Sequence, residues 1–238
     1  LWLARGRPLT AVLVLDLWLV GHGFNPAVDH RLLDFTPPSI EFLQDRQDAA
    51  QPWRLTTFDG EGEKLLNANS AMRYGLEDVR GYDSIIPKQY VEYMRRIHPQ
   101  GELLYNRIAP IYATLGDQPN DAALDNPLLH LLGVRYVMTT QTLSNEGYTL
   151  VYDDEVKIYE SAKAFPRAFI VGRAAAATGQ AAALDLLQGV DPAEIVVVEG
   201  LAHDALPPAA SPQLREARFS QRGTREYFID INISDRGW

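Results

Sequence analysis

Residues 126–139 read NPLLHLLGVRYVMT, and this stretch decides the fold because a helix signal leads directly into a strand signal. Asn126 is a preferred helix N-cap residue, and Pro127 suits the first helical position, where an N–H would have no partner. Gly133 favours termination of the helix, and the apolar run at 134–139 is typical of a buried strand. We expect three side chains of the helix to face inward: Leu128, Leu131 and Leu132.

Strand and helix signals alternate on both sides of this stretch. Strands are expected at 53–58, 134–139, 148–152, 156–159, 166–171 and 195–198, and helices are expected to begin near residues 37, 87, 127 and 181. Such alternation is typical of an α/β protein in which helices cover a sheet. The sequence therefore predicts an α/β layered domain with a mixed β-sheet and flanking helices, followed by the start of a β-rich module.

Three parts are expected along the chain. Residues 1–205 form the α/β domain, and the proline-rich residues 206–213 form a linker. Residues 214–238 form a β-hairpin that begins a truncated β module, because apolar and polar residues alternate from 225 to 234 as in a half-buried strand. The chain starts at Leu1 and stops at Trp238, just after a turn signal, which we interpret as boundaries within a longer polypeptide.

The N-terminal apolar run is interrupted only by Thr10 and Asp16 between residues 9 and 20. It is shorter than the roughly 20 residues that a membrane-spanning helix needs. Residues 12–20 end at Gly21 and suit a central strand that is buried on both faces. Asp16 would then lie within an apolar strand, where a carboxylate has to accept hydrogen bonds, and we expect backbone N–H groups at the strand exit to donate them.

The composition excludes several classes of function. Of the 238 residues, 31 are acidic and 22 basic, giving a formal net charge of −9 and arguing against nucleic acid as a partner. The chain has no cysteine, so disulfides, thiolate nucleophiles and cysteine-bound metals are excluded. Its five histidines are scattered without the i, i+4 pair of a helical zinc site.

Two motifs that could hold a cofactor or a metal are incomplete. The glycines at 21 and 23 lack the third glycine and the following helix of a dinucleotide loop. Asp59, Glu61 and Glu63 have the spacing of a calcium loop, but Lys64 and Ser70 stand where a glycine and a bidentate glutamate are needed. We therefore expect no cofactor and no metal, and we interpret residues 59–63 as a solvated acidic loop.

The densest polar cluster offers a candidate ligand site. It contains a tyrosine ring that could stack on a sugar, a carboxylate for its hydroxyls and cations for an anion. The candidate ligand-binding residues are Arg80, Tyr82, Asp83, Lys88 and Tyr90. The alternative is a loop that an Arg–Asp pair and tyrosine packing hold in place. No residue is assigned a catalytic role.

Several segments, taken in order, resemble a known family. They resemble the soluble extracytoplasmic region of bacterial YfhO-type polytopic membrane proteins. The resemblance covers about residues 9–238. The segments that carry it are DLWLVG at 16–21, FNP at 24–26, RGYDS at 80–84, PKQY at 87–90, LGVRYV at 132–137 and PRAF at 166–169.

The resemblance implies a multi-pass membrane protein similar to GT-C glycosyltransferases, which use lipid-phosphate-linked sugars. In such proteins the catalytic carboxylate lies in a loop among early transmembrane helices, so no catalytic residue is carried over to this chain. We expect a non-catalytic extracytoplasmic domain on the bacterial membrane, partnered by the transmembrane region of the same polypeptide and positioning a cell-envelope saccharide.

Two alternatives belong to other classes. A self-contained soluble enzyme acting on a sugar or a phosphate ester would need several polar side chains in one cleft, for which Asp16, Asp83 and a histidine are the candidates. A scaffold or partner-binding module would instead show an exposed apolar patch without a pocket.

Overall fold

The chain forms two compact units, Leu1–Pro37 and Pro38–Trp238. The computed structural model describes residues 2–24, 29–32, 34–60, 63–99, 107–200, 215–223 and 226–232. The first unit contains helix α1 (Trp2–Gly21) and the short 3-10 helix η1 (His30–Leu32). The expected linker at 206–213 and the last residues, 233–238, lie outside the described residues.

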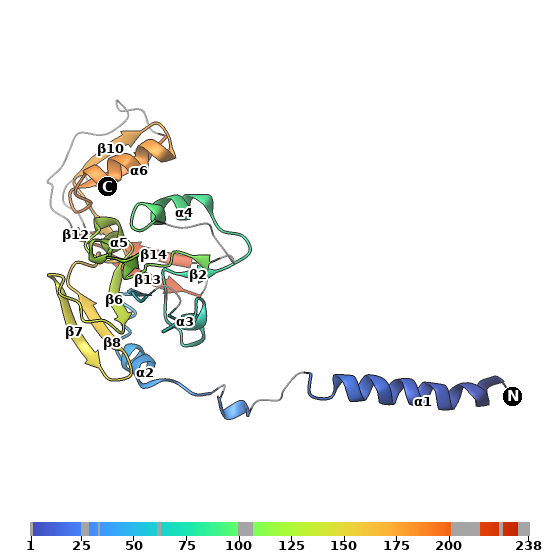
Figure 1. The fold of residues 1–238 in the computed structure, drawn as a ribbon. Helices are drawn as coiled ribbons and strands as arrows, with labels where there is room; N and C mark the ends of the chain where they lie inside the picture. The colour runs from blue at the N-terminus through green and yellow to red at the C-terminus, as the bar shows by residue number, and fades with distance from the viewer. Residues whose placement is uncertain are drawn as a thin grey trace. The chain divides into compact units, whose positions relative to one another are not determined.

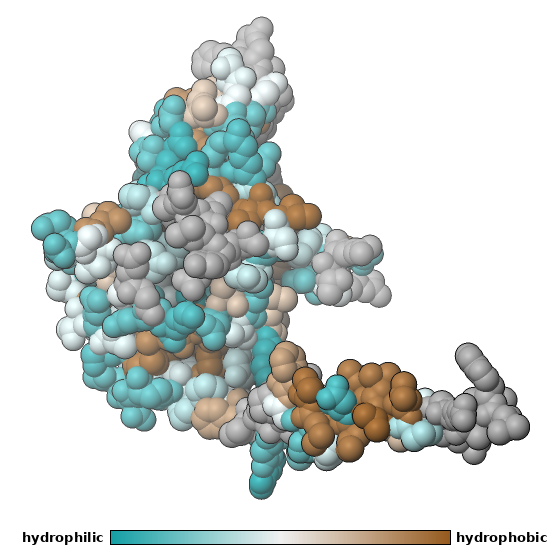
Figure 2. Space-filling model, turned by 45° about the vertical axis from the view of Figure 1, so that its right-hand side comes forward, coloured by the Kyte–Doolittle hydropathy of each residue, from teal (hydrophilic) through white to brown (hydrophobic). Residues whose placement is uncertain are grey.

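Helix α1 overturns the prediction of a buried strand at 12–20. Its apolar side chains between residues 9 and 20 are exposed, Leu9 at 77% and Val20 at 73%, and Figure 2 shows this apolar surface in brown. Asp16 lies on the same exposed helix and not inside a strand. A continuous apolar run has no periodicity that separates a helix from a strand, which is why the prediction was wrong. Among the described residues, no helix is long and apolar enough to span a membrane.

The second unit is built on a four-stranded mixed sheet with the order β1-β6-β8-β7. Strands β1 (Arg54–Thr57) and β6 (Val134–Thr139) are parallel, so their carboxyl ends lie at the same edge of the sheet. Strands β7 (Tyr148–Asp153) and β8 (Lys157–Ser161) form the predicted hairpin, at the lower left of Figure 1, and β8 pairs antiparallel with β6. The expected α/β fold with a mixed sheet is confirmed.

Both faces of this sheet are covered, because successive side chains of β6 pack into different buried clusters. Tyr136 and Met138 pack into one buried cluster with residues of α2 (Pro38–Gln44). Val137 packs on the opposite side, into a second cluster that includes residues of α4 (Lys88–Arg95) and α5 (Pro127–Leu131). This arrangement gives the layers of the fold, with helices on either side of one sheet.

The stretch at 126–139 folds as its sequence predicts. The Asn126 carboxamide oxygen accepts the Leu128 N–H at 3.0 Å and caps α5, and Gly133 follows the helix with a φ of 70°. Burial differs in detail from the expectation. Leu128 and its neighbour Leu129 are fully buried, whereas the other two expected leucines, at 131 and 132, are only half-buried.

The C-terminal third contains smaller sheets. Strands β10 (Arg173–Ala177) and β11 (Ile195–Glu199) are parallel and joined through α6 (Gln180–Gly189), although the alanine run of β10 was not predicted as a strand. Strand β9 (Phe169–Ile170) pairs with β12 (Arg215–Glu216). Strands β13 (Arg218–Arg222) and β14 (Glu226–Asp230) form an antiparallel hairpin, but β14 is exposed on both faces and not half-buried.

Short elements fill the connections that surround the site. Four of them are short strands that form two small antiparallel ladders, β2 with β3 and β4 with β5. Their bounds are α3 (Ser70–Arg73), β2 (Gly81–Tyr82), β3 (Arg107–Ile108), β4 (Thr114–Leu115), β5 (Gln118–Pro119) and η3 (Asp121–Ala123).

We expect Leu129→Ala to lower the free energy of unfolding by about 2–5 kcal/mol, because it removes a fully buried side chain from the α5 side of the sheet. Urea denaturation followed by tryptophan fluorescence measures this change. Leu150→Ala is the matched control, since Leu150 is 43% exposed on β7 and its truncation should cost less than about 1 kcal/mol. Equal losses for the two variants would contradict the assignment of this core.

Candidate functional site

A cavity of about 310 Å³ lies beyond the carboxyl end of β1. We call it the Arg80 cavity; its walls come from residues 57–59, the loop at 63–68, residues 80–82 and residues 110–112. Ligands of α/β proteins commonly bind outside the carboxyl ends of parallel strands, and β1 and β6 form such a pair. The fold therefore places this cavity where a ligand site is expected.

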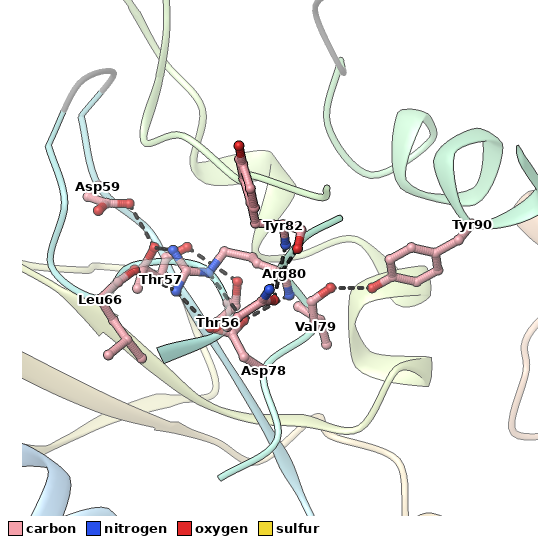
Figure 3. Close-up of polar contacts among 10 residues, drawn as sticks. Thr56, Thr57, Asp59, Leu66, Asp78, Val79, Arg80, Tyr82 and Tyr90 are labelled. Atoms are coloured by element: carbon pink, nitrogen blue, oxygen red, sulfur yellow. Dashed lines mark hydrogen bonds and ion pairs between the residues drawn. The ribbon is translucent and has the colours of Figure 1, made fainter. Parts of the chain in front are cut away.

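Arg80 is held at the floor of the cavity by four side-chain hydrogen bonds. Its Nε and Nη2 donate to the two carboxylate oxygens of Asp78, at 3.2 and 2.7 Å. Nη1 donates to the Thr57 hydroxyl at 2.6 Å, and Nη2 also donates to the Leu66 carbonyl at 3.1 Å. The side chains of Arg80 and Asp78 are 10% and 3% exposed, so this is a largely buried, bidentate ion pair (Figure 3).

The hydroxyl of Thr57 extends these contacts to a buried carboxylate. Because it accepts from Arg80, its own hydrogen is free to donate to Asp59 Oδ1, at 2.9 Å. Asp59 is only 4% exposed, and this burial raises its pKa. The bond from Thr57 and the positive charge of Arg80 act in the opposite direction but are weaker causes. Asp59 is thus a carboxyl group with a raised pKa in a cavity, which is a common property of functional sites.

Two of the residues expected in the site, Arg80 and Tyr82, lie at this cavity. The Tyr82 side chain is 51% exposed and points away from the Arg80 guanidinium in Figure 3. Its backbone is fixed by Asn69, whose carboxamide accepts the Tyr82 N–H at 3.0 Å and donates to the Tyr82 carbonyl at 2.6 Å. A half-exposed aromatic ring on a fixed backbone is available for stacking.

Tyr90 lies on the other side of Arg80 from Asp59 (Figure 3). Its hydroxyl donates to the Val79 carbonyl at 2.5 Å, and burial raises the pKa of Tyr90 to about 12. It lines a second hollow that shares Arg80 with the first and also contains Arg54. Tyr90 therefore packs beneath the site and does not enter the Arg80 cavity.

The remaining two expected residues, Asp83 and Lys88, do not line the cavity. Asp83 is exposed and accepts the Ile85 N–H at 3.2 Å in a local turn. Lys88 is 83% exposed and pairs with Glu92 at 3.5 Å, one helical turn further along α4. The arginine–aspartate pair that the alternative interpretation expected is present, and the aspartate is Asp78.

Sequence reasoning missed Thr57 and Asp59 as site residues. Assigning Asp59 to a solvated loop was wrong, because its backbone carbonyl accepts the Ala113 N–H at 2.9 Å and a β-bridge joins it to Tyr112. This pairing holds residues 112–113 against the backbone that follows β1, where Asp59 is 4% exposed. The available signal was the position of Thr57 and Asp59 at the end of a buried strand.

The buried histidines serve other parts of the structure. His98 is 2.7 Å from the Asn120 carboxamide nitrogen through Nδ1, and His130 Nε2 is 2.9 Å from the Leu124 carbonyl. Burial lowers the pKa of both. Of the residues that the enzyme alternative named, Asp16 lies on α1 in the first unit and Asp83 belongs to the second unit. No group of three metal-ligating side chains occurs among the residues described.

We expect Arg80→Ala to destabilise the fold by about 3 kcal/mol, because it leaves the Asp78 carboxylate buried without its partner. Lys88→Ala is the matched control and should leave the free energy of unfolding almost unchanged, since single exposed ion pairs contribute little. Chemical denaturation of both variants at neutral pH makes the comparison. A similar, small effect of both changes would show that the Arg80 pair does not hold the site.

Asp59→Asn tests the raised pKa of Asp59. A folded state with a raised carboxyl pKa binds the proton more tightly than the unfolded chain, whose value is near 3.8. Its stability relative to the unfolded state therefore falls as the pH rises from 3.8 through the raised pKa. Because asparagine does not ionise, we expect the variant to gain stability relative to the original protein across this window.

Urea denaturation of Asp59→Asn between acidic and neutral pH measures this gain. Asp83→Asn, on an exposed loop, is the control for a general effect of removing one carboxylate. A difference between Asp59→Asn and the original protein that does not vary with pH would contradict the assignment.

Comparison with known protein families, characterised proteins and solved structures finds no match to this chain. The geometry of the Arg80 cavity and the resemblance of the sequence segments are therefore the two grounds on which a function can be proposed.

Proposed function

We propose that this chain is a non-catalytic extracytoplasmic domain of a bacterial multi-pass membrane protein that resembles lipid-linked-sugar-dependent glycosyltransferases. Its Arg80 cavity binds one sugar unit of a cell-envelope glycan acceptor and positions it for the membrane-embedded region. That transmembrane region, in the same polypeptide, is its partner. The net charge of −9 argues against a nucleic-acid partner.

The single observation that carries the proposal is a half-exposed tyrosine ring beside a fixed polar floor. Tyr82 offers an aromatic face, while Thr57 and Asp59 are held in place by Arg80 beneath the same cavity. A sugar ring presents one apolar face and a rim of hydroxyls, so it matches a site that has both features. The volume of about 310 Å³ is near the lower end of small-molecule sites, which favours one sugar unit over a long chain.

The exposed apolar surface of α1 supports the second part of the proposal. Exposed apolar patches of this kind mark surfaces that bind a protein or a membrane. Along α1 the exposed side chains include leucines, valines and Trp18, the last at 57% exposure. The transmembrane region implied by the sequence resemblance would supply an apolar partner for this helix.

A self-contained enzyme remains the second candidate because two carboxylates, Asp59 and Glu63, line the same cavity. Most glycoside hydrolases use such a pair, one as acid and one as base or nucleophile. Release of nitrophenol from nitrophenyl glycosides by the purified chain would favour this candidate, provided that Asp59→Asn abolishes it. A scaffold without a ligand would instead show no sugar binding at the cavity.

Titration of the purified chain with neutral monosaccharides, followed by amide NMR shifts, tests the proposed function. We expect shifts to gather at residues 57–59, 63–68 and 80–82. Tyr82→Ala should weaken binding by roughly two- to tenfold, because a stacking contact contributes about 0.5–1.5 kcal/mol.

Tyr227→Ala provides the matched control for this experiment, since Tyr227 is 58% exposed on β14 and does not line the cavity. Its affinity for the sugar should equal that of the original protein. Absence of binding across a broad panel of cell-wall sugars, or binding unaffected by Tyr82→Ala, would refute the proposal.

A further inference from the structure

The arginine in the cavity does not make it an anion site. Asp78 balances the charge of Arg80, and the four side-chain bonds of Arg80 point to protein groups. An incoming phosphate would have to compete with Asp78 for the guanidinium. Since the Asp78 side chain is 3% exposed, such competition would leave a buried carboxylate without its partner, which is costly.

The other charges at the cavity are mainly negative. In the described part of the chain, the remaining charged lining residues are Asp59, Glu63 and Lys64. Two carboxylates therefore face one ammonium group, with Arg80 and Asp78 cancelling each other. Glu63 is exposed and, within the described residues, accepts two long hydrogen bonds, from the Gly60 N–H at 3.2 Å and the Thr140 hydroxyl at 3.4 Å. A carboxylate can accept about four hydrogen bonds, so Glu63 can accept further hydrogen bonds from a ligand.

Two other cations, the predicted Lys88 and the neighbouring Arg54, have partners outside the cavity. Lys88 pairs with Glu92 on α4 and does not line the cavity. Arg54 lines the hollow on the other side of Arg80, where its Nη1 donates to the Leu132 carbonyl at 2.8 Å and its Nε lies 3.4 Å from Glu77. Lys64 also lines the cavity, and its ammonium group forms no ion pair with any other described residue.

We infer that the Arg80 cavity selects its ligand by charge, accepting amine-bearing and neutral saccharides and rejecting phosphorylated and carboxylated ones. This inference rests on the proposed function, because it names the sugar class for the same site. A protonated sugar amine would lie near Glu63 and Asp59, while a neutral sugar would use only its hydroxyls and its apolar face. An anionic sugar would meet two carboxylates with only the Lys64 ammonium group to compensate, because the Arg80 guanidinium is paired with Asp78.

Four related monosaccharides provide the test: glucosamine, glucose, glucose 6-phosphate and glucuronic acid, each titrated into the purified chain at neutral pH and low salt. We expect glucosamine to bind roughly two- to fivefold more tightly than glucose, the range of one partly exposed ion pair. Glucose 6-phosphate and glucuronic acid should bind more weakly than glucose, and added salt should reduce all of these differences.

Glu63→Gln isolates the charge, since it keeps the size of the side chain. We expect this variant to lose most of the preference for glucosamine over glucose and to bind the anionic sugars better relative to glucose. Glu199→Gln is the matched control, because Glu199 is exposed on β11 and does not line the cavity. It removes the same charge from the molecule and should leave all four affinities unchanged.

The outcomes separate this inference from the proposed function. If none of the four sugars binds, the proposed function fails and the inference fails with it. If glucose binds but the phosphorylated or carboxylated sugar binds equally well or better, the charge selection is overturned and the saccharide site remains. If Glu199→Gln alters the affinities as much as Glu63→Gln does, the selection arises from the net charge of the protein and not from this cavity.

Discussion

The ion pair between Arg80 and Asp78 fastens a long connection to the end of β1. Its two members belong to a segment that also bonds to β1 through the backbone, with the Leu55 N–H donating to the Glu77 carbonyl at 2.8 Å and the Val79 N–H to the Leu55 carbonyl at 3.1 Å. The guanidinium then reaches Thr57 and the Leu66 carbonyl, which orders the loop above the sheet. The same contacts that hold the connection therefore build the floor of the cavity.

The mixed sheet explains why the cavity lies at this edge. Strands β1 and β6 are parallel and therefore end together, and their buried residues pack into clusters on both faces of the sheet. Polar side chains that follow such a strand cannot enter either apolar layer, so they collect at its carboxyl edge. Asp59 is buried there, and Tyr112 and Ala113 pair with its backbone. The cavity is thus a consequence of strand direction and of one loop that closes over the strand end.

Only part of the candidate site could be predicted from the sequence, because some of its residues come from segments that are far apart along the chain. Arg80 and Tyr82 were found because both belong to one short segment of polar and aromatic residues. Asp83 and Lys88 belong to the same stretch but point into a turn and along α4. Neighbouring residues can point in different directions, so sequence proximity alone does not define a site. Thr57 and Asp59 join it from more than twenty residues away, and the expected free arginine is neutralised by Asp78.

The sequence by itself determined the elements that carry their own local signals. Asn126, Pro127 and Gly133 set the bounds of α5 through capping and backbone conformation, which act over a few residues, and the turn before β8 likewise formed as expected. Only the tertiary structure decided that the apolar run at 12–20 is an exposed helix and that the alanines of β10 form a strand, because these runs lack a distinguishing period. It also decided the burial of Asp59 and the pairing of Arg80, since both depend on groups that distant parts of the chain bring together.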